Sequence, residues 1–175
     1  MSIRKRTKYL TVSAMLCALG VILLSLGSVI EVIDLTAAVV ASMLCIYAVI
    51  EIGGFYPAAI WLVTSALGLL LLPQKSPAVF YAFFFGFYPI VKEKFEKLKK
   101  PISMVCKLGV FHGCMAVIGG IFLLFMPGMV DQTAKWWFFL VIYAMALVCF
   151  FLYDLALSRL ITFYLIRLRN RFRIK

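Results

Sequence analysis

Eight polar and aromatic residues near the ends of apolar stretches have side chains suited to binding a small molecule. They are Gln74, Lys75, Tyr81, Phe84, Asp131, Gln132, Trp136 and Trp137. Amide, carboxylate and ammonium groups can fix the orientation of a ligand, while aromatic rings form the largely apolar walls of small-molecule pockets. We therefore expect these residues to contribute to a ligand site. The two tryptophans are also typical of an aromatic anchor at a membrane surface, and the charged residues are also typical of solvated loops.

The remaining polar residues do not indicate catalytic chemistry. His112 is the single histidine, which is too few for a two-histidine metal site, and the five cysteines share no spacing typical of metal ligands. The chain contains no Gly-x-Ser-x-Gly, His-Glu-x-x-His or Walker motif. We therefore predict no enzymatic activity, no metal and no cofactor. The sequence leaves the roles of His112, Glu51 and Asp154 open between structure and function.

The composition indicates a membrane protein. Of the 175 residues, 65% are apolar and 14% are charged, and the mean hydropathy is +1.08. A soluble domain of this size would leave much of that apolar surface in water, because small folds bury only part of their surface. No polar domain, internal repeat or low-complexity tract interrupts the apolar stretches. We therefore predict one all-α integral membrane domain over residues 1–175.

Six apolar stretches are suited to span a membrane as helices, since about 20 residues cross the hydrocarbon core. They cover residues 9–30, 35–52, 54–72, 77–91, 104–126 and 136–157. The boundary between the second and third stretches is the least marked. A single helix over both would nevertheless be about 57 Å long, nearly twice the thickness of the core. Gly53-Gly54, followed by Pro57, predicts the break between them.

The basic residues divide unevenly between the two ends of these spans. With six spans, sixteen of the eighteen Lys and Arg lie on the side of both termini, and only Lys75 and Lys135 lie on the other. Cytoplasmic loops carry an excess of Lys and Arg, so both termini are predicted to be cytoplasmic. Residues 158–175 are predicted to continue the last span as a basic helix at the interface. We expect the basic segments to contact anionic lipid, and we expect no nucleic-acid partner.

The fourth stretch carries an aromatic run, from Tyr81 to Tyr88, that ends against a basic cluster. Gly86 has no side chain and can admit a neighbouring helix closely, and Pro89 lacks an N–H, which predicts a kink. We expect Gly86 to separate two zones. Tyr81 and Phe84 lie in the zone nearer the outside and are the better ligand candidates, whereas Tyr88 is predicted to be an anchor at the inner interface.

Small residues spaced by about one helical turn mark three of the stretches. Ala14 and Ala18 share one face of the first, at a spacing that lets another membrane helix approach closely. Comparable faces, for which we expect packing within the protein, consist of Ala37, Ala41 and Cys45 in the second stretch and of Gly109, Gly113, Ala116 and Gly120 in the fifth.

Six short spans, cytoplasmic termini, the Ala14/Ala18 face and a basic connection after the fourth span together resemble the S components of energy-coupling factor transporters. The resemblance implies a multi-pass protein of the bacterial inner (plasma) membrane that captures a vitamin or similar micronutrient from outside. It also implies that Ala14 and Ala18 dock on a transmembrane coupling subunit driven by two ATPases. The rod-shape protein MreD has a similar six-span architecture, so a structural or assembly role without transport is the alternative.

Overall fold

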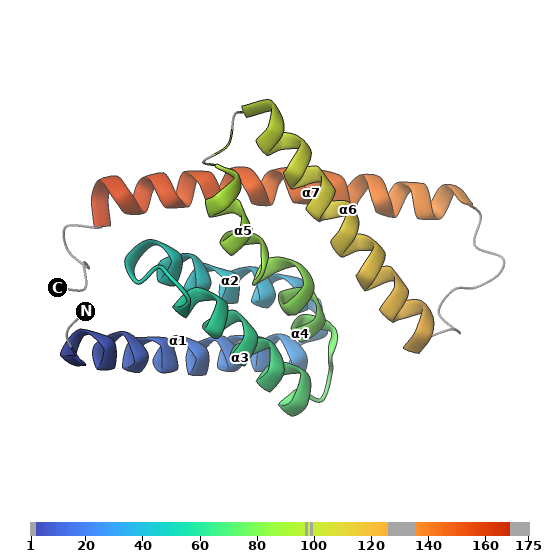
Figure 1. The fold of residues 1–175 in the computed structure, drawn as a ribbon. Coiled ribbons are helices and arrows are strands. Elements are labelled where there is room, and N and C mark those ends of the chain that lie inside the picture. The colour runs from blue at the N-terminus through green and yellow to red at the C-terminus, as the bar shows by residue number, and fades with distance from the viewer. Residues whose placement is uncertain (1–2, 97, 99, 126–135, 169–175) are drawn as a thin grey trace. The chain divides into compact units, whose positions relative to one another are not determined.

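The computed structural model describes residues 3–96, 98, 100–125 and 136–168, and this part of the chain consists of helices joined by short turns, without a strand (Figure 1). The predicted all-α class is therefore confirmed. The chain divides into two compact units, Met1–Ile118 and Gly119–Lys175. Helix α6, Lys100–Phe125, begins in the first unit and ends in the second. Whether the units form one membrane domain stays a prediction.

Four helices of the described chain are long and apolar enough to cross a membrane. The stretches that qualify are Arg6–Val29 in α1 (Ile3–Val29), Asp34–Glu51 as the whole of α2, Pro101–Ile121 in α6, and Leu140–Ile166, which covers most of α7 (Trp136–Phe163). Helix α3, Tyr56–Leu71, is apolar but shorter. These lengths and compositions are typical of a membrane protein.

Helices α1, α2 and α3 pack against one another in the first unit, and α2 runs in the opposite direction to α1 and α3 (Figure 1). A short 3-10 turn, Glu31–Ile33, connects α1 to α2. Gly53 and Gly54 connect α2 to α3 with φ values of 65° and 64°, a left-handed conformation that glycine adopts without strain. The predicted break at this position is confirmed. Pro57 lies in the first turn of α3, where its missing N–H removes no helical hydrogen bond.

Glycines allow these helices to approach one another closely. A Cβ at Gly27 of α1 would lie 2.6 Å from the Cβ of Ala37 on α2. A Cβ at Gly20 of α1 would lie 3.0 Å from the Cγ2 of Thr64 on α3. Both distances are shorter than ordinary van der Waals contact, so α1 packs on its neighbours through positions that have no side chain.

Two small-residue faces that were predicted to pack internally differ in outcome. In α2, Ala37, Ala41 and Cys45 are buried, at 8%, 0% and 0% exposure, and the prediction is confirmed. In α6, no described atom lies within 4 Å of a Cβ built at Gly109 or Gly113. The expected close packing is therefore not found at these two glycines.

The fourth apolar stretch folds as a broken helix. Helix α4, Ser76–Phe80, passes into a π-helical segment, η2, at Tyr81–Phe85, and α5, Tyr88–Phe95, follows after a turn. The N–H of Gly86 donates to the carbonyl of Tyr81 at 2.7 Å, which is the five-residue spacing of a π-helix. Pro89 lies in the first turn of α5, so it separates two helical segments where a kink in one continuous helix was predicted.

The end of this stretch differs from its prediction in two respects. The helix continues beyond Val91 to Phe95. Lys92 is only 1% exposed and lies 3.4 Å from Glu96, the residue that follows the last turn of α5, a spacing that favours the helix. Tyr88 is fully buried, and its ring stacks on that of Phe84 with centroids 5.7 Å apart. The prediction that Tyr88 is an anchor at the membrane interface is therefore wrong.

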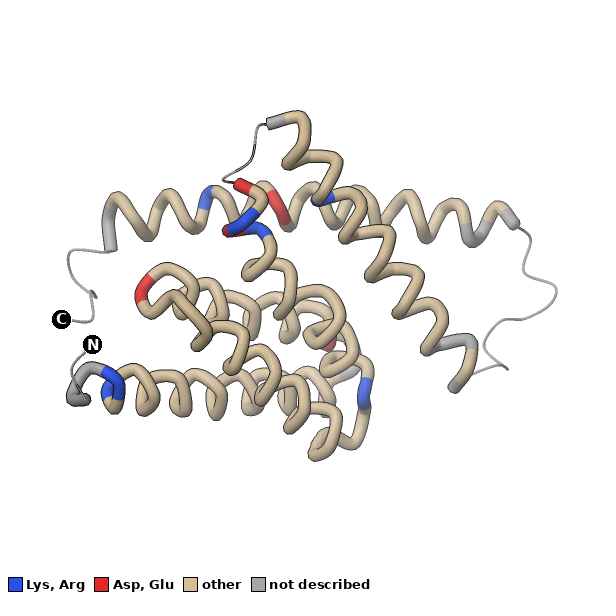
Figure 2. The backbone as a smooth tube through the Cα atoms, in the orientation of Figure 1, with Lys and Arg blue, Asp and Glu red and all other residues tan. Residues whose placement is uncertain are grey.

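Charged residues of the first unit lie near the ends of its helices, with the exception of Lys107 within α6, and leave long uncharged stretches in α1, α2 and α3 (Figure 2). In the second unit, α7 passes into a π-helical segment, η4, at Tyr164–Leu168. The predicted helical continuation of the last span is therefore confirmed as far as Leu168. The remaining residues of the basic segment 158–175 lie outside the described chain.

Candidate functional site

The end of α1 at Ser28 is tied to the connection between α3 and α4. The Ser28 hydroxyl donates to the backbone carbonyl of Gln74 at 3.0 Å and accepts from the backbone N–H of Gln74 at 2.9 Å. The Lys75 ammonium donates to the carbonyl of Leu72 at 2.6 Å and so caps the end of α3. Two predicted ligand residues thus have structural roles here, through the Gln74 backbone and the Lys75 side chain.

Tyr81 and Phe84, the aromatic ligand candidates of the first unit, lie in its core. They are 1% and 9% exposed. The Phe84 ring contacts those of Phe85 and Phe111, with centroids 5.0 and 6.2 Å apart, in addition to its stack on Tyr88. A ligand could reach either side chain only if this aromatic cluster opened, and their role in binding stays a prediction.

The break in the fourth stretch is stabilised by side chains from two other helices. The Trp61 indole N–H on α3 donates to the carbonyl of Ala82 at 2.8 Å, and the Cys45 thiol on α2 lies 3.5 Å from the carbonyl of Gly86. A Cβ at Gly86 would lie 2.7 Å from Trp61 Cδ1 and 2.8 Å from the Tyr81 ring. Gly86 therefore admits a close neighbour, as predicted, and the neighbour is an aromatic side chain.

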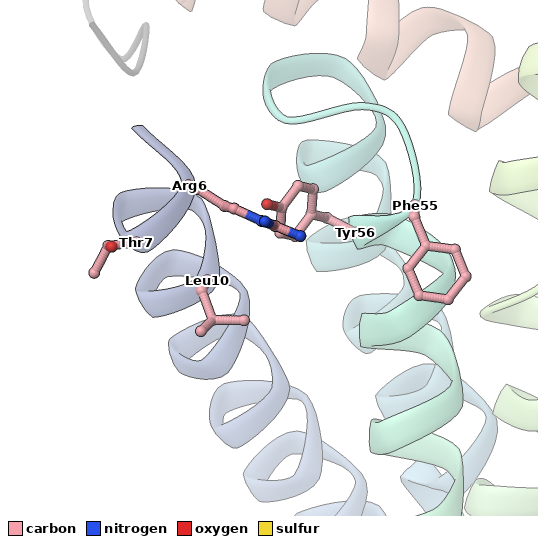
Figure 3. Close-up of a pocket in the computed structure, with 5 residues that line it drawn as sticks. All are labelled: Arg6, Thr7, Leu10, Phe55 and Tyr56. Atoms are coloured by element: carbon pink, nitrogen blue, oxygen red, sulfur yellow. The ribbon is translucent and has the colours of Figure 1, made fainter. Parts of the chain in front are cut away.

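An open cleft lies at the opposite end of α1, between the first turns of α1 and α3 (Figure 3). Its volume is about 630 Å³, and it is lined by Arg6, Thr7, Leu10, Phe55 and Tyr56. The Arg6 side chain extends from α1 toward the Tyr56 ring (Figure 3). Sequence reasoning missed this cleft; the signal for it was an arginine just before the first apolar stretch and an aromatic residue near the start of the third.

The ring of Tyr56 is held in place by a second tyrosine. The rings of Tyr9 on α1 and Tyr56 on α3 meet edge to face, with centroids 5.9 Å apart and planes at 72°. This geometry is favourable for aromatic pairs, and it joins the two helices beside the cleft. The cleft therefore has one wall whose position is fixed by packing.

Ala14 and Ala18, the predicted docking residues, are exposed on α1. Their neighbours Met15 and Leu19 are 62% and 48% exposed, so this face of α1 is apolar as well as narrow. The opposite face of the same helix carries buried residues such as Leu16 and Leu24. Helix α1 therefore packs within the first unit through one face and leaves the alanine face uncovered.

The remaining ligand candidates belong to the second unit. Trp137 is 59% exposed in the first turn of α7. Trp136 is the first residue of α7, and the structure does not describe its side chain. Asp131 and Gln132 lie outside the described residues altogether. A role of these four residues in binding stays a prediction.

The polar residues of uncertain role show little that resembles a reaction centre. His112 is exposed, and its Nδ1 lies 2.8 Å from the carbonyl of Leu108 one turn earlier in α6. Among the described residues, no three His, Cys, Asp or Glu side chains are close enough to hold a metal ion together.

Comparison of the chain with protein-family models, with curated proteins and with solved structures finds no match in any of the three. The class to which the fold belongs, a helical membrane protein, therefore follows from its own helices alone.

Proposed function

We propose that this protein is the ligand-binding membrane subunit of a nutrient uptake system and that it works with a separate coupling protein and ATPases. The observation that carries the proposal is the exposure of Ala14 and Ala18 on a helix whose other small positions, Gly20 and Gly27, contact neighbouring helices. Small residues on an exposed face offer a membrane helix a surface for close approach, since association in lipid depends on packing.

The proposal includes six membrane spans with both termini in the cytoplasm of a bacterial cell. Its support is the agreement in position between the six apolar stretches and the helical segments, together with the sixteen-to-two division of basic residues. Cysteine labelling from outside the cell tests it. Single cysteines at positions 74 and 132 should react with an impermeant thiol reagent, whereas cysteines at positions 6 and 96 should not. The reverse pattern would overturn the orientation.

Replacement of both alanines by tryptophan tests the docking surface. The variant Ala14→Trp, Ala18→Trp should reduce co-purification of a membrane partner by about tenfold, because interhelical contacts in membranes contribute about 1–2 kcal/mol. Ala66→Trp is the matched control, since Ala66 is an exposed alanine on α3. Unchanged association of the double variant, or equal loss in the control, would contradict docking through this face.

Native mass spectrometry of the purified protein separates uptake from an assembly role. Uptake predicts a retained small molecule together with a coupling subunit. Retention of a partner without any small molecule, in protein from cells grown in rich medium, would favour the MreD-like alternative.

A further inference from the structure

We propose that the cleft between Arg6 and Tyr56 binds one anionic phospholipid, with the lipid phosphate at the Arg6 guanidinium and the Tyr56 hydroxyl. The proposal depends on insertion of α1 in a membrane and is independent of any transport function. The other basic residues are spread over several segments of the chain, whereas this proposal gives Arg6 a specific lipid site.

The polar groups of the cleft are suited to an anion. Arg6 carries a guanidinium that offers several N–H donors in a plane, which matches the oxygen atoms of a phosphate. No ion pair joins Arg6 to an acidic residue within the described part of the chain. The Tyr56 hydroxyl can donate a further hydrogen bond, and its ring is held by Tyr9. An anion would therefore meet a cation and a fixed donor.

The apolar groups of the cleft favour a lipid over a free anion. Leu10 is 65% exposed and Phe55 is 79% exposed, and both line the same cavity as Arg6. Leu10 lies one turn from Arg6 along α1, toward the middle of the apolar stretch (Figure 3). A free phosphate would leave both side chains uncovered, whereas an acyl chain that extends from a bound phosphate would cover them.

The position of the cleft along the helices agrees with the depth of a headgroup. Arg6 lies three residues before the apolar stretch that begins at Tyr9, and Tyr56 is the first residue of α3. Arginine and tyrosine at the end of an apolar helix lie at the level of the phospholipid headgroups. The cavity of about 630 Å³ lies within the size range of small-molecule sites.

Lipid retention by the full-length protein tests the site. The protein is purified in a mild detergent, incubated with phosphatidylglycerol or phosphatidylcholine, and measured by native mass spectrometry. Wild type should retain one phosphatidylglycerol in preference to phosphatidylcholine. Arg6→Gln should weaken this retention about tenfold, because charge-assisted hydrogen bonds are among the strong ones. Tyr56→Phe should weaken it by a smaller factor.

Lys8→Gln is the matched control, because it removes one positive charge at an exposed position two residues away that does not line the cleft. Its retention of phosphatidylglycerol should change less than about twofold, as expected for a screened surface charge. Equal losses in Arg6→Gln and Lys8→Gln, or equal retention of the two lipids by wild type, would overturn the proposal. Circular dichroism establishes whether the variants fold. If Arg6→Gln does not fold, the loss of phosphatidylglycerol retention in Tyr56→Phe tests the site in its place.

A competition experiment distinguishes a lipid site from a site for free phosphate. Inorganic phosphate at millimolar concentration should leave the bound phosphatidylglycerol in place. Displacement of the lipid by phosphate alone would show that the cleft binds a free anion, which would contradict the proposed occupant.

Discussion

The two ends of α1 lie in different surroundings. At the Ser28 end, the hydroxyl of Ser28 forms hydrogen bonds with the backbone N–H and carbonyl of Gln74. Gly27 lies against α2 without room for a methyl group. At the Arg6 end, a charged side chain and a tyrosine line an open cleft. Polar groups at the closed end form hydrogen bonds that hold the fold, whereas Arg6 and Tyr56 at the open end line a cleft.

This difference shows that a position near the membrane surface does not by itself make a polar residue a ligand-binding residue. Lys75 and Arg6 are both basic residues beside the end of an apolar helix. The ammonium of Lys75 caps α3, while the guanidinium of Arg6 faces a cavity. The distinction depends on whether a backbone carbonyl lies within reach, which is a property of the fold.

The largest expected effect is at Gly27. Gly27→Ala should lower the free energy of unfolding by about 1–3 kcal/mol, because the new methyl group would overlap the Cβ of Ala37 at 2.6 Å. Gly109→Ala is the control, since its surroundings are open among the described residues and alanine favours a helix by about 0.5–1 kcal/mol. Unfolding in denaturing detergent, followed by circular dichroism, measures both. The same sign for the two variants would contradict close packing at the Ser28 end.

A comparable or slightly smaller loss is expected at Ser28. Ser28→Ala should destabilise the protein by about 1–3 kcal/mol, because it leaves the N–H and the carbonyl of Gln74 without their partner. Ser25→Ala is the matched control: its hydroxyl bonds only to the carbonyl of Val21 in its own helix, so a change within about 0.5 kcal/mol is expected. Equal free energies of unfolding for the two serine variants would show that the hydrogen bonds between Ser28 and Gln74 do not stabilise the fold.

The smallest effect on stability is expected at the open end. Arg6→Gln should change the free energy of unfolding by less than about 0.5 kcal/mol, since Arg6 is exposed and has no acidic partner in the described chain. The measurement is the same unfolding titration, in detergent without added lipid. A loss as large as that of Ser28→Ala would mean that Arg6 holds the fold, and the contrast between the two ends would fail.

The breaks between helices were the most predictable feature of the fold. The break at Gly53-Gly54 was predicted, and so was the gap between the stretches 54–72 and 77–91, where α3 ends at Leu71 and α4 begins at Ser76. Such breaks depend on the backbone conformations that individual residue types allow, which are local. The boundary at Lys92 was predicted less well, because a charge was taken to end the helix although it pairs with Glu96 and is buried.

Side-chain surroundings were predicted less well than breaks. The close approach at Gly86 was expected, yet the partner turned out to be the rings of Trp61 and Tyr81. Tyr88 was expected at the membrane surface and lies fully buried against Phe84. Which way an aromatic ring of a helix faces depends on the helices packed around it, and a single sequence does not contain that information.

The sequence by itself determined that this chain is helical, apolar enough for a membrane, and broken at Gly53-Gly54, because hydropathy and backbone preference are properties of short segments. The tertiary structure alone decided that Lys75 caps a helix, that Ala14 and Ala18 remain uncovered, and that Arg6 and Tyr56 line one cleft. Those outcomes depend on residues that are distant in the chain and meet only when helices pack.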